Sequence, residues 1–111
     1  MLIAVGDIYA QVQRRDAVRE LMRATQSRAR EEAGCIGYAF AETLDDPGHF
    51  LVVQQWQDQA ALDEHYRSEA FADYQAKIGE HLVRSSELRL HRVQESARPV
   101  DPSPIEISEE D

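Results

Sequence analysis

The fold is decided by residues 35–56, which read CIGYAFAETLDDPGHFLVVQQW. Large side chains alternate with other residues over 35–43 and again over 49–56, and this period of two predicts two strands. Between them stands Asp45-Asp46-Pro47-Gly48. Because Pro presets φ and Gly adopts conformations closed to other residues, these four residues predict a turn. Residues 35–56 are therefore expected to form an antiparallel hairpin.

The residues before this hairpin predict a strand and then a helix. Over 2–10 both alternating sets of side chains are largely apolar, which is typical of a strand covered on both faces. From about Asp16 apolar residues recur at intervals of three and four as far as Ala29, and Gly34 is suited to end the helix.

The residues after the hairpin predict two short helices and a last strand. Asp58 and Ser68 are plausible N-caps, each followed by apolar residues at helical spacing, and residues 84–94 alternate again. The order is β-α-β-β-α-β. This order predicts an α+β, ferredoxin-like split βαβ fold, in which a four-stranded antiparallel sheet carries both helical segments on one face.

The other face of such a sheet has no cover within one chain. Because residues 2–10 are apolar on both sides, that face must be buried by something, and a second copy is the simplest supplier. We therefore expect a homodimer in which the two sheets face each other.

Length and composition limit the class of protein. The 111 residues fit one domain, and the single cysteine, Cys35, excludes an intramolecular disulfide. A net charge of -9 disfavours nucleic acid as a partner, and no apolar run is long enough to span a membrane. The first residues do not resemble a signal peptide, so the expected location is the cytoplasm.

The acidic charge is unevenly placed along the chain. Residues 1–95 have the composition of a folded domain, whereas 96–111 are rich in proline and end in acids. Such a segment is expected to be disordered, or to be an arm laid over a partner subunit with Ile105 and Ile107 docking on one face.

Three stretches, in this order and at these separations, resemble the antibiotic biosynthesis monooxygenase domain. They are residues 34–38 (GCIGY), residues 45–50 (DDPGHF) leading to Trp56, and residues 61–71 (ALDEHYRSEAF). The resemblance covers about residues 1–95. It implies a dimeric α+β barrel that oxidises quinols or polycyclic aromatic compounds with dioxygen and needs no metal, flavin or haem.

Such a reaction requires a base that deprotonates a flat aromatic substrate in a dry pocket, because a phenolate gives up an electron more readily than a phenol. His65 is the candidate catalytic base, since an imidazole titrates near neutrality and its helix is expected to face the sheet. A purely structural histidine, bonded to the backbone or to Ser68, would produce the same sequence.

The candidate substrate-binding residues are mostly aromatic. Trp56 ends its strand near the start of the helix that carries His65, and Asp7 is an acid on an otherwise apolar strand face. Asp7 either lines the pocket or forms a structural ion pair with Arg89 or Arg92. The remaining candidates are the aromatic residues Tyr9, Tyr38, Tyr66 and Phe71.

No metal site is predicted, because the four histidines show none of the spacings typical of metal ligands. A haem-degrading branch of the superfamily carries Asn, Trp and His where Asp7, His65 and Gln75 stand here, so haem degradation is disfavoured. Quinol-oxidising relatives often carry an acid at the position of Gln54. Two hypotheses follow: a cofactor-independent monooxygenase acting on a small phenolic, quinol or polycyclic aromatic substrate, or a non-catalytic dimeric module that binds small aromatics or acts as a scaffold.

Overall fold

A computed structural model of the chain describes residues 1–97 and 99. The tail expected over 96–111 therefore lies almost entirely outside the described residues. The elements follow one another as β1 (Leu2–Tyr9), the 3-10 helix η1 (Val12–Arg14), α1 (Arg15–Ala29), β2 (Cys35–Glu42), β3 (His49–Trp56), α2 (Gln59–Arg67), α3 (Glu69–Gly79) and β4 (Glu87–Arg92).

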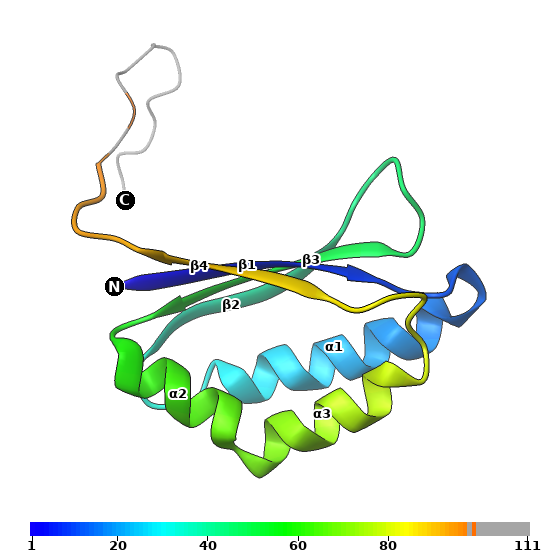
Figure 1. The fold of residues 1–111 in the computed structure, drawn as a ribbon, viewed down its shortest axis with the longest axis horizontal. Helices are drawn as coiled ribbons and strands as arrows, with labels where there is room; N and C mark the ends of the chain where they lie inside the picture. Colours follow the sequence, from blue (N-terminus) through cyan, green and yellow to red (C-terminus); the bar gives the residue numbers. More distant parts are fainter. Residues whose placement is uncertain (98, 100–111) are drawn as a thin grey trace.

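The four strands form one antiparallel sheet in the order β2-β3-β1-β4. The α-helices of the described chain all lie on one face of this sheet (Figure 1). The predicted α+β fold and its order of elements are confirmed. The last strand is shorter than expected, because pairing with β1 begins at Glu87 and ends at Arg92.

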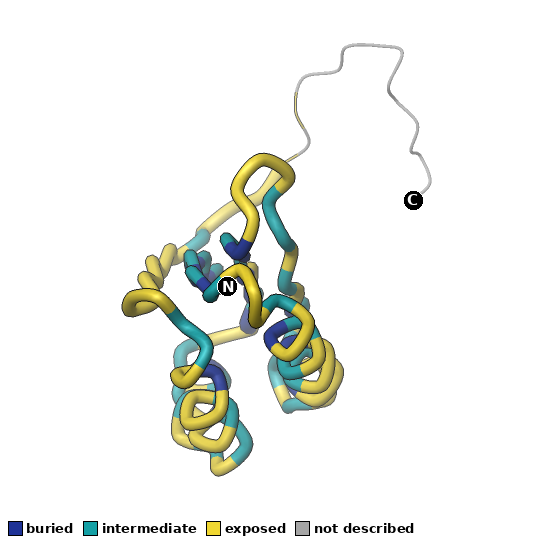
Figure 2. The backbone as a smooth tube through the Cα atoms, turned by 90° about the vertical axis from the view of Figure 1, so that its right-hand side faces the viewer, coloured by how far each residue is buried: buried dark blue, intermediate teal, exposed yellow. Residues whose placement is uncertain are grey.

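The core lies between the sheet and the helices, on what we call the inner face. Burial alternates along β1, where every second residue from Leu2 to Ile8 is buried. In Figure 2 the helices are exposed, in yellow, on the sides that face away from the sheet, and buried, dark blue segments lie where helices and sheet face each other. The inner face of β3 contributes Phe50, Val52 and Trp56, and Trp56 is fully buried. The helices complete this core with Val18, Met22, Leu62 and Ile78.

Gly34 brings the end of α1 against the first turn of α2. Its φ is +81°, and a Cβ added there would lie 2.5 Å from the Cβ of Ala61. Only a residue without a side chain combines this backbone conformation with this close approach. The chain between α1 and β2 is thereby held beside α2.

Both predicted N-caps are formed. Asp58 accepts a hydrogen bond from the backbone N–H of Ala61, and Ser68 accepts one from that of Phe71. The Ser68 hydroxyl also donates to the carbonyl of His65, at 2.7 Å. The Ser68 side chain therefore provides hydrogen-bond partners for a backbone carbonyl at the end of α2 and for a backbone N–H at the start of α3. These two bonds fix the bend at which His65 lies.

The opposite, outer face of the sheet bears no helix of the described chain (Figure 1). Its central residues come from three neighbouring strands and are apolar: Ile3, Val5, Ala39, Ala41, Leu51 and Val53. Val53 is 39% exposed, and it pairs with Val5 on one side and Ala39 on the other.

The helices over residues 1–97 are all too short or too polar to cross a lipid bilayer.

Candidate functional site

A cavity of about 400 Å³ lies between the inner face of the sheet and α3. We call it the aromatic cavity because Tyr38, Phe40, Tyr66, Phe71 and Tyr74 form much of its wall. The other lining residues are Gly6, Ile8, Val52, Gln54, Gln75, Ile78, Gly79, Leu82, Ser85, Ser86, Glu87 and Leu88. Its size and apolar wall suit a small flat molecule.

Gly6 forms part of the floor of this cavity. A Cβ at this position would lie 2.9 Å from Cδ1 of Leu88, 3.0 Å from the carbonyl oxygen of Glu87 and 3.1 Å from Cγ1 of Val52. The absence of a side chain therefore lets β1 pack tightly against its neighbours while it lines the cavity.

A chain of hydrogen bonds supplies the cavity with an oriented hydroxyl group. The indole Nε1 of Trp56 donates to Oε1 of Gln54 at 2.9 Å, and this interaction fixes the orientation of the Gln54 amide. Nε2 of Gln54 then donates to Oη of Tyr66 at 3.0 Å. Since Oη also lies 3.2 Å from Oε1, the Tyr66 proton has two possible acceptors, Gln54 and a bound ligand.

Burial keeps the tyrosines of the cavity in their neutral form. Desolvation raises the pKa of Tyr38, Tyr66 and Tyr74, and most strongly that of Tyr38. These phenols therefore act as neutral hydrogen-bonding groups at neutral pH, and none is available as a ready-formed base.

His65 lies behind the cavity wall and is 3% exposed. Its Nδ1 is 2.7 Å from Oε1 of Glu32, and its Nε2 is 3.3 Å from Oη of Tyr38. Its ring packs against Trp56, with centroids 4.9 Å apart, and against Phe71, at 5.1 Å. Both ring nitrogens thus have partners, and the hydroxyl partner belongs to a residue that lines the cavity.

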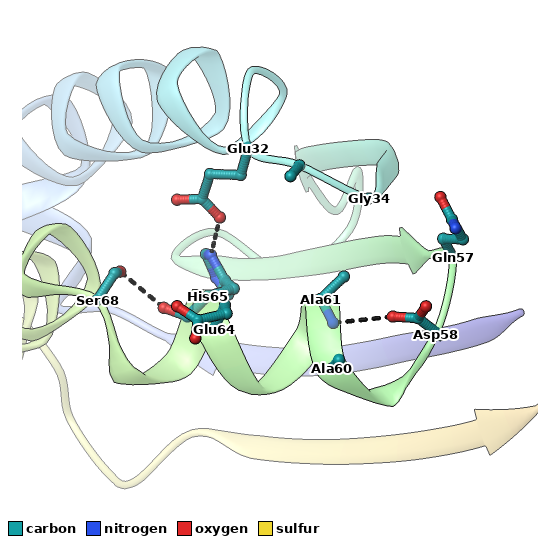
Figure 3. Close-up of a pocket in the computed structure, with 10 residues that line it drawn as sticks. Glu32, Gly34, Gln57, Asp58, Ala60, Ala61, Glu64, His65 and Ser68 are labelled. Carbon is teal, nitrogen blue, oxygen red and sulfur yellow. Dashed lines mark hydrogen bonds and ion pairs between the residues drawn. The ribbon is translucent and has the colours of Figure 1, made fainter.

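On its other side His65 meets a second, open depression of about 550 Å³, which Figure 3 shows. We call it the acidic hollow, after Glu32, Asp58 and Glu64. It is also lined by Ala33, Gly34, Gln57, Ala60, Ala61, His65 and Ser68. In Figure 3 the imidazole points from α2 toward the Glu32 carboxylate, across the gap between α2 and the end of α1.

The structure brings five of the seven predicted site residues together. Tyr38, Tyr66 and Phe71 line the aromatic cavity. Trp56 and His65 do not line it, but each is hydrogen-bonded to a residue that does. None of His65, Trp56 and Asp7 therefore lines the cavity, and the predicted base lies one side chain behind its wall.

Asp7 and Tyr9 lie elsewhere, on the outer face of the sheet, so the expectation of one site that also contains Asp7 is not met. Oδ1 of Asp7 is 2.8 Å from Nε2 of His49, and its Oδ2 is 3.2 Å from Nη1 of Arg89. These hydrogen bonds lower the pKa of the Asp7 carboxyl. The structural ion pair with Arg89 is therefore the alternative that the structure supports.

Tyr9 belongs to the same outer cluster as Asp7. Its ring stacks on that of His49, with centroids 4.7 Å apart. Cζ of the Arg84 guanidinium lies over the Tyr9 ring, 3.8 Å from the ring centre. Tyr9 therefore cannot touch a ligand held in the aromatic cavity of the same protomer.

Two residues that matter for the site were not among the candidates. Glu32 is 33 positions from its partner His65, so no local spacing connects them. Gln54 lies on the inner face, and its alternation with Val52 and Trp56 along β3 is the signal in the sequence that points to this position.

No group of three or more His, Cys, Asp or Glu side chains within the described residues is arranged to hold a metal ion. Cys35 is partly buried, and desolvation raises the pKa of its thiol. A raised pKa makes this thiol a weak nucleophile.

Comparison with known proteins identifies the family to which the chain belongs. The family model described as antibiotic biosynthesis monooxygenase matches residues 1–77. A Mycobacterium tuberculosis protein named "Putative monooxygenase Rv0793" is 36% identical over 70 residues, which are 63% of this chain and 68% of that protein. An uncharacterized protein of Synechocystis is 25% identical over 95 residues, 86% of this chain and 65% of that protein, so this chain spans slightly less than two thirds of its length.

Solved structures agree with this assignment. The structure of Rv0793 superposes with a TM-score of 0.80 at 27% identity and covers 87% of this chain and 98% of that one. A Deinococcus radiodurans structure shares the fold with a TM-score of 0.86 at 23% identity, over 91% and 100% of the two chains. With the family model spanning residues 1–77, this chain belongs to the antibiotic biosynthesis monooxygenase family.

Proposed function

We propose that this chain is a monooxygenase that oxidises a small, neutral phenol, hydroquinone or related polycyclic aromatic compound with dioxygen, without a metal or an organic cofactor. The aromatic cavity is the observation that carries the proposal, because its rings suit a flat substrate and the Tyr66 hydroxyl suits a substrate oxygen. Membership of the family supports the class of reaction.

The charge of the wall supports a neutral substrate. Within the described chain, Lys, Arg and His are absent from the residues that line the aromatic cavity. A carboxylate or phosphate on the substrate would be buried there without a counter-charge, at a cost of several kcal/mol. Uncharged phenols avoid this cost.

In the proposed reaction His65 is the general base. Loss of the phenolic proton converts the substrate into an electron-rich anion, which donates an electron to dioxygen and then combines with the reduced oxygen. The substrate supplies all four electrons: one oxygen atom enters the product and the other leaves as water. The protein provides the position, the base and a dry environment.

The test is oxygen consumption in metal-free buffer with a panel of uncharged hydroquinones and anthrones, compared with carboxylated analogues. We expect turnover of uncharged members, with one atom of ¹⁸O₂ in the product and the other in water. Formation of hydrogen peroxide without labelled product would overturn the monooxygenase assignment. Binding without any oxygen consumption would instead support the non-catalytic aromatic-binding module.

His65 is tested by substitution with Gln, which fills most of the space of the ring, and with Ala. We expect each variant to lower kcat by about 10²-fold or more. His81→Gln is the matched control, because His81 lies outside both the aromatic cavity and the acidic hollow and bonds Arg14. Unchanged rates in folded His65→Gln would remove His65 from the mechanism.

We also propose that the protein is a homodimer formed through the outer faces of two sheets. The apolar residues at the centre of this face, Val5, Leu51 and Val53 among them, are continuous across three strands, and the helices of the described chain leave them uncovered. Two copies of such a face can pack on each other about a two-fold axis, which is the commonest symmetry of soluble oligomers.

A further inference from the structure

Three side chains in a row separate the aromatic cavity from the acidic hollow. Tyr38 lines the cavity, Glu32 lines the hollow, and His65 lies between them with hydrogen bonds to both, at 3.3 Å and 2.7 Å. His65 is 3% exposed, whereas the Glu32 side chain is 25% exposed. The row therefore runs from the protein interior to solvent.

We assign the direction of the hydrogen bonds from the partners, with Glu32 ionised and the imidazole neutral. An ionised carboxylate accepts hydrogen bonds and donates none, so the hydrogen between Glu32 and His65 belongs to Nδ1 of the imidazole. In a neutral imidazole this tautomer leaves the lone pair on Nε2. Nε2 then accepts from the Tyr38 hydroxyl.

We propose that Tyr38, His65 and Glu32 form a proton relay that carries the phenolic proton of the substrate out of the aromatic cavity and into the acidic hollow. This inference rests on the proposed function, and it assigns a separate exit to the proton.

In the proposed step the substrate hydroxyl gives its proton to Oη of Tyr38 while Tyr38 gives its own proton to Nε2 of His65. The substrate becomes a phenolate, Tyr38 ends as it began, and His65 becomes an imidazolium. The Glu32 carboxylate stabilises the new positive charge through the Nδ1–H bond. No oxidant or other reactant is consumed in this step.

Burial of Tyr38 favours a paired transfer. Because desolvation raises the pKa of its phenol, a tyrosinate on its own is costly, and a phenol that gains one proton as it loses another avoids that state. Tyr38 is then a catalytic residue, since it touches the substrate. Glu32 is a positioning residue, because it acts through His65.

The surroundings of Glu32 offer the proton an outlet. Glu32 and Glu64 both line the hollow, and Arg28 lies near Glu32 and His65 on the side toward α3. The hollow is large enough for many water molecules, so the imidazolium can return its extra proton to solvent while the substrate stays in the cavity. Dioxygen and substrate then need not share their entrance with the departing proton.

The first arm of the test needs no substrate. Nitrogen-15 NMR of the histidine rings reports which nitrogen of His65 carries the proton. We expect Nδ1 to be protonated and Nε2 to accept a hydrogen bond, and we expect Tyr38→Phe to remove the signature of that bond at Nε2. A proton found on Nε2 in the unsubstituted protein would overturn the relay, because Nε2 would have no lone pair to receive another.

The second arm measures turnover of an uncharged hydroquinone. Tyr38→Phe and Glu32→Gln are expected to lower kcat by about 10- to 100-fold and to alter the solvent deuterium isotope effect, and KM should stay nearly unchanged in Glu32→Gln. Glu64→Gln is the matched control, because Glu64 lines the same hollow and takes no part in the hydrogen bonds that join Tyr38, His65 and Glu32. If both relay variants keep the rate and isotope effect of the unsubstituted enzyme, the relay is wrong.

Chemical rescue distinguishes a relay from a structural role. Because Glu32 faces an open hollow, formate or acetate added to Glu32→Ala should restore at least tenfold in kcat, whereas chloride at equal ionic strength should not. If neither formate nor acetate restores kcat, the result would contradict a role of the Glu32 carboxylate in proton transfer. If the unsubstituted protein oxidises none of the panel, the proposed function fails, and the NMR arm still decides the direction of the hydrogen bonds.

Discussion

Nε2 of His49 lies 2.8 Å from Oδ1 of Asp7, on the face of the sheet that is opposite to His65. The same carboxylate receives a hydrogen bond from Arg89 on the strand at its other side. Three strands are thus joined by one acid that is 16% exposed. The acid in the apolar strand is explained by these partners rather than by the aromatic cavity.

Asp7 is expected to make the free energy of unfolding depend on pH in the acidic range. Its pKa is lower in the folded protein than in the unfolded chain, because His49 and Arg89 stabilise the carboxylate. The stabilisation is therefore present above the ordinary carboxyl pKa, about 4, and is lost as the pH falls through the lowered value. In urea titrations at several pH values, Asp7→Asn should be less stable at neutral pH and should lose less stability on acidification.

Asp45→Asn is the control for this experiment, since Asp45 lies exposed in the hairpin turn. If Asp7→Asn and the unsubstituted protein lose stability equally between pH 6 and pH 3, the carboxylate has no preferential stabilisation in the folded state.

Val53 tests the proposed dimer. It is 39% exposed at the centre of the outer face, and a lysine there would place a charge in the middle of the apolar contact. We expect light scattering at micromolar concentration to give the mass of two chains for the unsubstituted protein and of one chain for Val53→Lys. Leu44→Lys, at a hairpin position that is 99% exposed, should remain a dimer. A monomer mass before any substitution would refute the proposal.

Tyr66 tests the hydroxyl on the cavity wall. Tyr66→Phe removes the oxygen and keeps the ring that packs against Phe71. One lost hydrogen bond of about 1 kcal/mol should raise the KM or the dissociation constant for phenols about fivefold. The substitution should leave the affinity for an analogue without a hydroxyl group nearly unchanged. An unchanged affinity of Tyr66→Phe for phenols would show that Tyr66 contributes by packing alone.

Substitution of Gln54 tests the hydrogen bonds that join Trp56, Gln54 and the Tyr66 hydroxyl. Gln54→Leu would leave the buried Nε1–H of Trp56 without an acceptor, which should cost about 1–3 kcal/mol of unfolding free energy in urea titrations. Gln57→Leu, three positions along and exposed, should change stability by less than about 0.5 kcal/mol. Equal effects of the two substitutions would argue that the buried indole finds another partner.

Gly34 and Gly79 form a matched pair. Gly34→Ala should destabilise the protein by more than about 1 kcal/mol, because φ is +81° and the new Cβ would meet Ala61. Gly79→Ala, at the end of α3 with no atom within 4 Å of the new Cβ, should be neutral or stabilising by up to about 1 kcal/mol. Thermal unfolding should therefore move to a lower temperature in Gly34→Ala and stay unchanged or move to a higher one in Gly79→Ala, and a similar fall in both variants would contradict this account.

Local patterns were enough to predict the fold. The alternation in β2 and β3 and the residues of their turn defined the hairpin, and Asp58 and Ser68 marked the starts of α2 and α3, as the structure confirms. These features depend on residues within about four positions of one another. For this reason they can be recognised in a single sequence.

The site was predicted less completely, for two physical reasons. Both faces of β1 carry apolar residues, so alternation placed Asp7 with Tyr9 without showing that their face lies away from the helices. The pairing of Glu32 with His65 depends on the close approach at Gly34, a tertiary contact with no local pattern. Tyr38, Tyr66 and Phe71 were found because aromatic residues on inner faces must meet near the core.

The floor of the cavity lies apart from the groups proposed to act on a ligand. Leu88 of β4, beside Gly6, lines this floor, whereas those groups belong to β2, α2 and the turn after α1. Selection for substrates of another size can therefore work on position 88 while the acid–base groups are retained. The fold offers a scaffold on which breadth of substrate choice and reactivity can be altered independently.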